Sequence, residues 1–155
     1  MLVVVGDVPK DALHARAQTP DSILENARRL GLEHNLRFTG PLVGAALDEA
    51  WYAADVHVFP VRELPNDPEG FGMVAIEAAA HGLPTVAYAT GGVVDAVADG
   101  QSGSLVPPGD AASFADAVLQ LLAKPLDEAG IRAFARDFAW EAFGERVGRV
   151  LPTTR

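Results

Sequence analysis

The chain has 155 residues, no cysteine and a formal net charge of -9 at pH 7. Its length suits one domain with a single hydrophobic core, and the lack of cysteine excludes disulfide bonds and thiolate metal sites. The negative charge argues against nucleic acid, which is bound mainly through basic clusters. No apolar run is long enough to cross a membrane, and the start lacks the basic segment of a signal peptide. We therefore expect a cytoplasmic protein.

Predicted strands and helices alternate along the chain. Strands are expected at 2–5, 35–39, 55–59, 84–88 and 103–106, and helices at 20–30, 42–54, 72–81, 90–98, 113–122, 127–138 and 141–150. This alternation predicts an α/β fold, a Rossmann-like doubly wound parallel sheet of about five strands followed by carboxyl-terminal helices. Ligands of such sheets bind outside the carboxyl ends of the strands, where the loop at 60–72 is expected to lie.

The most informative stretch is 69–84, which reads Glu-Gly-Phe-Gly-Met-Val-Ala-Ile-Glu-Ala-Ala-Ala-His-Gly-Leu-Pro. Glu77 is the only charged residue of an otherwise apolar predicted helix, so we expect its carboxylate to be buried. A buried carboxylate needs donors, which come either from the protein, through an ion pair or a cap, or from a ligand. The glycines at 70 and 72 favour the ligand, because they let the backbone approach a diphosphate at a helix N-terminus.

Two glutamates frame this helix start, Glu69 and Glu77. Eight helical residues rise roughly 12 Å, about the span from the sugar to the ribose of a nucleotide sugar. The spacing alone is weak evidence, because Glu25 and Glu33 repeat it in a polar setting. The apolar context and the glycines carry the prediction of a nucleotide-sugar site.

The chain resembles a known family in several linked motifs. These are Glu69-Gly-Phe-Gly-x4-Glu77, Ala-x-Gly82-x-Pro84-x-Val86, Gly91-Gly92 and Gly100-x2-Gly103-x-Leu105-Val106. In this combination they resemble the carboxyl-terminal domain of the family 4 retaining glycosyltransferases, which have the two-domain GT-B fold. The resemblance covers nearly the whole chain, so we predict that 1–155 is a single Rossmann-like nucleotide-sugar-binding domain.

The resemblance implies a role for each matched residue. Glu69 corresponds to the catalytic-site glutamate that contacts the hydroxyls of the donor sugar, and Glu77 to the one that accepts the ribose hydroxyls. The turn from Thr39 to Leu42 corresponds to the one beside the nucleobase. The remaining donor-binding positions face the sugar and the phosphates, and they are Gly70, Phe71, Gly72, Met73 and Val74. The family needs no metal or other cofactor, and it displaces the diphosphate from the front side with retention of configuration.

The chain departs from the family in two respects. Asp95 stands where the family usually has glutamate. The family's first strand of this domain, with the arginine and lysine that follow it, has no counterpart before Leu2, and the amino-terminal acceptor domain is absent. Those cations stabilise the leaving diphosphate, so we expect the fragment to bind the donor but to be inactive alone. Arg62 is a weak substitute, because Glu63 and Asp67 are nearer partners.

Two other functions remain as alternatives. One is a non-catalytic nucleotide- or sugar-binding module, and the other is a dinucleotide oxidoreductase, which the missing Gly-x-Gly-x-x-Gly after the first strand disfavours. Any contact with a membrane surface is expected only through the missing part, which also binds the unknown acceptor. The absent strand would be central in the sheet. We expect the strands around Val3 and Val56 to pair directly, or another chain to fill the gap.

Overall fold

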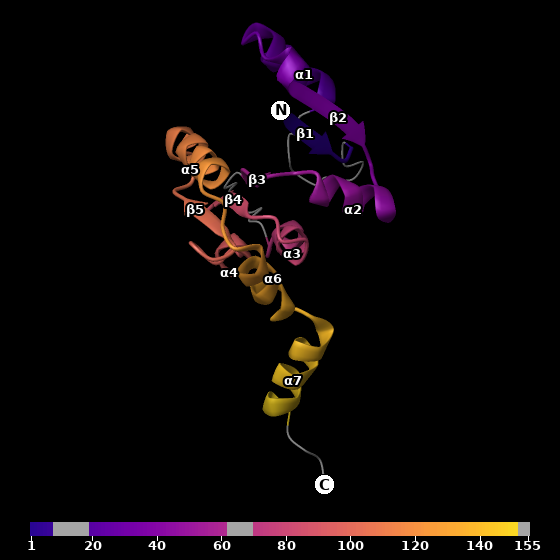
Figure 1. Ribbon diagram of the computed structural model, residues 1–155, viewed down its shortest axis with the longest axis vertical. Helices are drawn as coiled ribbons and strands as arrows, with labels where there is room; N and C mark the ends of the chain where they lie inside the picture. The colour runs from indigo at the N-terminus through magenta and orange to yellow at the C-terminus, as the bar shows by residue number, and fades with distance from the viewer. Residues whose placement is uncertain (8–18, 62–69, 152–155) are drawn as a thin grey trace. The chain divides into compact units, whose positions relative to one another are not determined.

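The computed structural model describes residues 1–7, 19–61 and 70–151, and it divides into two compact units, Met1–Glu49 and Ala50–Arg155. In the first unit, strand β1 (Leu2–Val5) pairs in parallel with β2 (Leu36–Gly40), with Val3 opposite Arg37 (Figure 1). Helix α1 (Pro20–Arg29) and the 3-10 turn η1 (Glu33–Asn35) precede β2.

Local sequence signals set the start of α1. The hydroxyl of Thr19 accepts a hydrogen bond from the backbone N–H of Ser22 at 3.2 Å, and Pro20 occupies the first helical position. Both features are typical of helix starts, because Pro lacks the N–H that would otherwise need a partner there. The predicted start of this helix is therefore confirmed.

The second unit contains a three-stranded parallel sheet in the order β3-β4-β5, formed by His57–Phe59, Thr85–Tyr88 and Gly103–Val106. Helix α2 (Ala45–Tyr52) crosses the boundary between the units. The other helices are α3 (Met73–Ala80), α4 (Val93–Ala96), α5 (Ala111–Ala123), α6 (Glu128–Arg136) and α7 (Trp140–Val150). None of the helices in the described ranges has both the length and the apolar character needed to cross a membrane.

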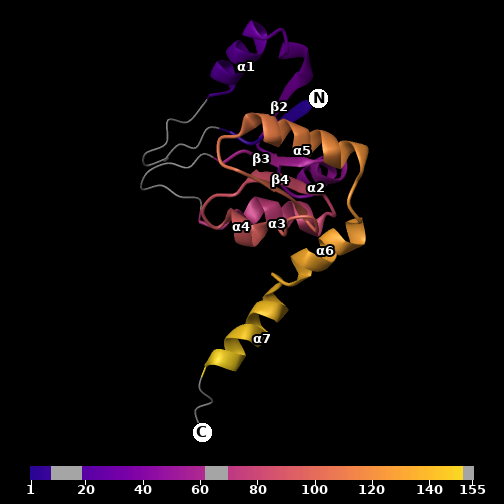
Figure 2. The same ribbon diagram turned by 90° about the vertical axis from the view of Figure 1, so that its left-hand side faces the viewer.

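Helices cover both faces of the β3-β4-β5 sheet. Helix α5 lies on one face, and α3 and α4 lie on the other (Figure 2). Neighbouring residues of β4 therefore join different cores: Val86 packs with Leu121 of α5, and Ala87 packs with Ala75 and Ile76 of α3. This is the alternation expected of a strand that is buried on both faces. Helix α6 packs along α3 and completes the core that contains Ala75, Ile76 and Ala87.

The α/β fold with parallel strands is confirmed, but the strands form two small sheets. Within the described residues β1 is bonded to β2, and β3 is bonded to β4. The predicted direct pairing of the strands around Val3 and Val56 would be a contact between the two compact units, and it stays a prediction. The single domain over 1–155, and the filling of the gap by another chain, stay predictions.

Candidate functional site

Helix α3 begins at a glycine that no other residue replaces easily. Gly72 has φ 82° and ψ 51°, in the left-handed region, and a Cβ added there would lie 2.9 Å from Cε1 of Phe59. Its carbonyl accepts the N–H of Ala75 at 2.9 Å, which closes the first turn. The first N–H groups of a helix have no partner within the helix, so this end of α3 can bind an acceptor such as a phosphate oxygen.

Only one side of α3 is buried. The inner side consists of Ala75, Ile76, Ala78 and Ala79, which are at most 7% exposed. The outer side carries Met73, which is 60% exposed, together with Val74, Glu77 and Ala80. These four positions follow helical spacing and share one face. The candidate site therefore has three exposed apolar side chains beside one exposed carboxylate.

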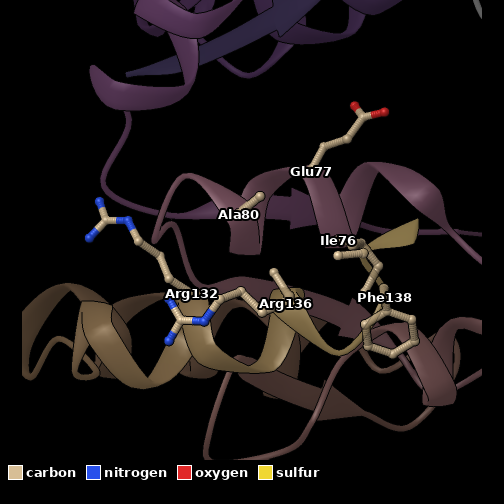
Figure 3. Close-up of a pocket in the computed structure, with 8 residues that line it drawn as sticks. Ile76, Glu77, Ala80, Arg132, Arg136 and Phe138 are labelled. Carbon is tan, nitrogen blue, oxygen red and sulfur yellow. The ribbon is translucent and has the colours of Figure 1, made fainter. Parts of the chain in front are cut away.

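The predicted burial of Glu77 is wrong, because this carboxylate is exposed. The small alanines let one face of α3 pack closely against α4 and α6, and the opposite face stays open. Within the described residues the Glu77 carboxylate has no hydrogen-bond or ion-pair partner. Figure 3 shows it directed away from Arg132 and Arg136. It is therefore available to an external donor such as a hydroxyl group.

An open groove of about 380 Å³ runs beside Glu77 (Figure 3). Its walls come from α3 and from α6 with the turn that follows, and they consist of Ile76, Glu77, Ala80, Arg132, Ala135, Arg136, Phe138 and Ala139. Sequence reasoning missed the α6 residues of this groove, because nothing local in the sequence connects them to α3.

The remaining predicted residues fall in three places. Gly70 and Phe71 lead directly into α3, and the ring centroids of Phe71 and Phe138 lie 5.5 Å apart. Leu42 is half-buried in the first compact unit. Glu69 and Arg62 lie outside the described residues, so the role predicted for Glu69 stays a prediction.

Two loops meet beneath the start of α3. The segment Gly70–Gly72 follows β3, and Gly91–Gly92 follows β4, so both come from the carboxyl ends of neighbouring strands. A Cβ on Gly92 would lie 2.0 Å from the carbonyl oxygen of Gly70. Ligands of parallel α/β sheets bind at this end of the strands. The Gly-Gly pair was visible in the sequence, but its contact with Gly70 was not predicted.

The electrostatics of the second unit include one strongly shifted group. Burial lowers the pKa of His57 from 6.5 to about 4. His57 lies in β3, where its Nδ1 is 3.1 Å from the hydroxyl oxygen of Thr85. No group of three or more metal-binding side chains occurs in the part of the chain that the structure describes.

Comparison with known sequences gives consistent matches. A family model described as glycosyl transferases group 1 matches residues 1–124. A D-inositol 3-phosphate glycosyltransferase of Geodermatophilus obscurus is 42% identical over 125 residues, which are 80% of this chain and 27% of that protein. One of Corynebacterium diphtheriae is 38% identical over 138 residues, or 86% of this chain and 31% of that protein. The chain thus spans less than a third of either relative.

Two solved structures are also similar to this chain. Sucrose-phosphate synthase from Thermosynechococcus elongatus is 30% identical, with a TM-score of 0.71 over 96% of this chain and 37% of that one. Anabaena HepE, solved in complex with UDP-glucose, is 26% identical, with a TM-score of 0.70 over 95% of this chain and 39% of that one.

Proposed function

The chain belongs to the glycosyl transferases group 1 family, and from that premise we propose that it is the donor-binding part of a retaining glycosyltransferase of family 4. The protein that contains it would transfer a sugar from a nucleotide-diphosphate sugar to an acceptor. The observation that carries the proposal is the outer side of α3, where exposed Met73, Val74 and Glu77 follow a left-handed glycine at the carboxyl end of β3.

Each part of the donor has a proposed partner. The N–H groups of the first turn of α3 bind the diphosphate, because an anion is favoured at the positive end of a helix dipole. The Glu77 carboxylate accepts hydrogen bonds from the ribose hydroxyls. Glu69 contacts the sugar, and the turn that ends at Leu42 contacts the base; both assignments rest on the family resemblance. HepE binds UDP-glucose, which supports a nucleotide sugar as the ligand.

The proposal extends to the conditions of the reaction. The family resemblance supports transfer without a metal ion and with retention of configuration. It also supports an acceptor site outside this chain. A cytoplasmic location is proposed from the sequence alone. The cations that stabilise the leaving diphosphate are proposed to lie outside the chain too, so 1–155 alone is expected to bind the donor without transferring it.

The ribose contact gives a direct test. The protein encoded by the complete gene would be titrated with UDP and 2′-deoxy-UDP by calorimetry, and with GDP and ADP if UDP does not bind. Glu77→Gln removes the charge but keeps the size, so we expect about a tenfold loss of UDP affinity, the usual worth of a hydrogen bond to a charged group. The loss should be smaller for 2′-deoxy-UDP, which lacks one of the two hydroxyls.

The matched control is Asp116→Asn. Asp116 is also an exposed carboxylate, but it lies on α5, which covers the opposite face of the sheet. It should leave nucleotide affinity unchanged. Equal UDP affinity in the wild type and in Glu77→Gln would remove the ribose role of Glu77. Binding of UDP-sugars by the complete protein without transfer to any acceptor would favour the non-catalytic module.

A further inference from the structure

Gly92 is a glycine for reasons of space alone. Its backbone has φ -78° and ψ 0°, which any residue adopts. A Cβ at this position would nevertheless lie 2.0 Å from the carbonyl oxygen of Gly70 and 2.9 Å from the Cα of Phe71. Atoms of these types do not approach so closely, and the obstacle is backbone rather than a mobile side chain. The missing side chain of Gly92 therefore fixes how near the Gly70–Phe71 peptide lies to the start of α4.

The same segment is held at two further points. Gly72 lies against the ring of Phe59, where a Cβ would be 2.9 Å from Cε1. Phe71, between the two glycines, packs against the core between α3 and α6. The centroid of its ring lies 5.5 Å from the centroid of the Phe138 ring. Three successive residues thus rest on Gly92, Phe138 and Phe59. Among the described residues nothing lies within 4 Å of the place where a Cβ of Gly70 would be.

We propose that Gly92 is a positioning residue of the donor site. By lying directly against the Gly70–Phe71 peptide, it sets the position of the segment that leads into the N-terminus of α3 and so aims the first N–H groups of that helix. Phe138 holds the same segment through Phe71. The inference rests on the proposed function, because it assigns those N–H groups to the diphosphate.

Any side chain at position 92 would have to displace the site segment. A Cβ needs more than 3.0 Å from a backbone oxygen, so Gly92→Ala would push the Gly70 carbonyl by about 1 Å, and a shift of that size at an aligned site can cost up to about 100-fold. The effect would fall on the phosphates, which the N–H groups bind, and much less on the nucleoside, which Glu77 contacts from the next turn.

Gly103 provides a matched control. A Cβ there would lie 1.9 Å from the carbonyl oxygen of Thr85, an equally severe clash with backbone. This contact joins β4 to β5 in the sheet, away from the Gly70–Gly72 segment. Gly103→Ala is expected to lower stability as much as Gly92→Ala, but the folded protein should keep the wild-type preference for a diphosphate.

The test compares the affinities of UDP and uridine for the protein encoded by the complete gene. Calorimetry measures UDP binding, and nuclear magnetic resonance titration measures uridine binding. Circular dichroism measures the folded fraction of each variant. We expect Gly92→Ala to lower the ratio of UDP to uridine affinity about tenfold, whereas Gly103→Ala leaves it unchanged. An unchanged ratio in folded Gly92→Ala would overturn the inference.

A second variant covers the case in which Gly92→Ala does not fold. Phe138→Leu loosens the support of Phe71 without adding an atom, and it should lower the ratio of UDP to uridine affinity by a smaller factor. An unchanged ratio would then overturn the inference.

Wild-type protein that binds none of UDP, GDP and ADP would overturn the proposed function, and this inference with it. Wild-type binding with an unaltered ratio in the variants would overturn this inference alone.

Discussion

The guanidinium of Arg132 on α6 donates a hydrogen bond of 2.9 Å to the backbone carbonyl oxygen of His81, the residue that ends α3. The same guanidinium covers Gly82, where a Cβ would lie 2.7 Å from its central carbon. The last carbonyls of a helix have no partner within the helix, and a cation there also complements the helix dipole. Arg132 therefore fixes the end of α3 that lies opposite the proposed phosphate site.

This contact predicts a loss of stability in Arg132→Ala. A hydrogen bond from a charged group contributes about 2 kcal/mol, and the variant leaves the His81 carbonyl to water or without a partner. The free energy of unfolding would be measured by urea denaturation. Arg149→Ala is the control, because Arg149 is 78% exposed and lies 3.8 Å from its partner Glu145, a type of pair that contributes little. Equal stability of the two variants would contradict the role assigned to Arg132.

The start of α3 predicts a large effect of Gly72→Ala. The residue has φ 82°, which costs a side-chain-bearing residue about 1–2 kcal/mol, and the new Cβ would also press on Phe59. Displacing a packed ring adds about 1–3 kcal/mol. Gly100→Ala separates the two terms, because Gly100 has φ 75° but open space around it. If both variants lose the same free energy of unfolding, the contact with Phe59 contributes nothing.

Features that depend on neighbouring residues were predictable from the sequence. The capping of α1 by Thr19 and the glycine before α3 follow local rules, and the order of strands and helices follows from the hydrophobic pattern. The exposure of Glu77 did not follow. Almost every residue of α3 is apolar, so the pattern does not mark which face is buried, and only packing against α6 decides it.

Contacts between segments that are distant in the sequence could not be predicted from the sequence either. Gly92 meets Gly70 only because two loops leave neighbouring strands at the same edge, and Arg132 meets His81 across 51 residues of sequence. Gly92 has an ordinary φ, so the sequence does not show why glycine is needed there. The reason is the close approach of the Gly70 carbonyl, which only the structure reveals.

His57 predicts how stability depends on pH. Its imidazole packs against the rings of Trp51 and Phe59, with centroid distances of 5.3 and 5.9 Å, and burial lowers its pKa from 6.5 to about 4. Between these two values the unfolded chain binds a proton that the folded protein does not. Stability from His57 is therefore complete above pH 6.5 and falls as the pH drops toward 4, by up to about 3 kcal/mol.

The double variant His57→Phe/Thr85→Val tests this pH dependence. It removes the titrating ring together with the buried hydroxyl of Thr85, which is 1% exposed and would otherwise lose its partner. The free energy of unfolding, measured by urea denaturation from pH 7 to pH 4, should fall less steeply in the variant, and the difference cancels the carboxylates common to both proteins. His34→Asn, which alters a ring that is 92% exposed, should keep the wild-type slope. Parallel curves for the wild type and the double variant would show that His57 is protonated equally in the folded and unfolded states.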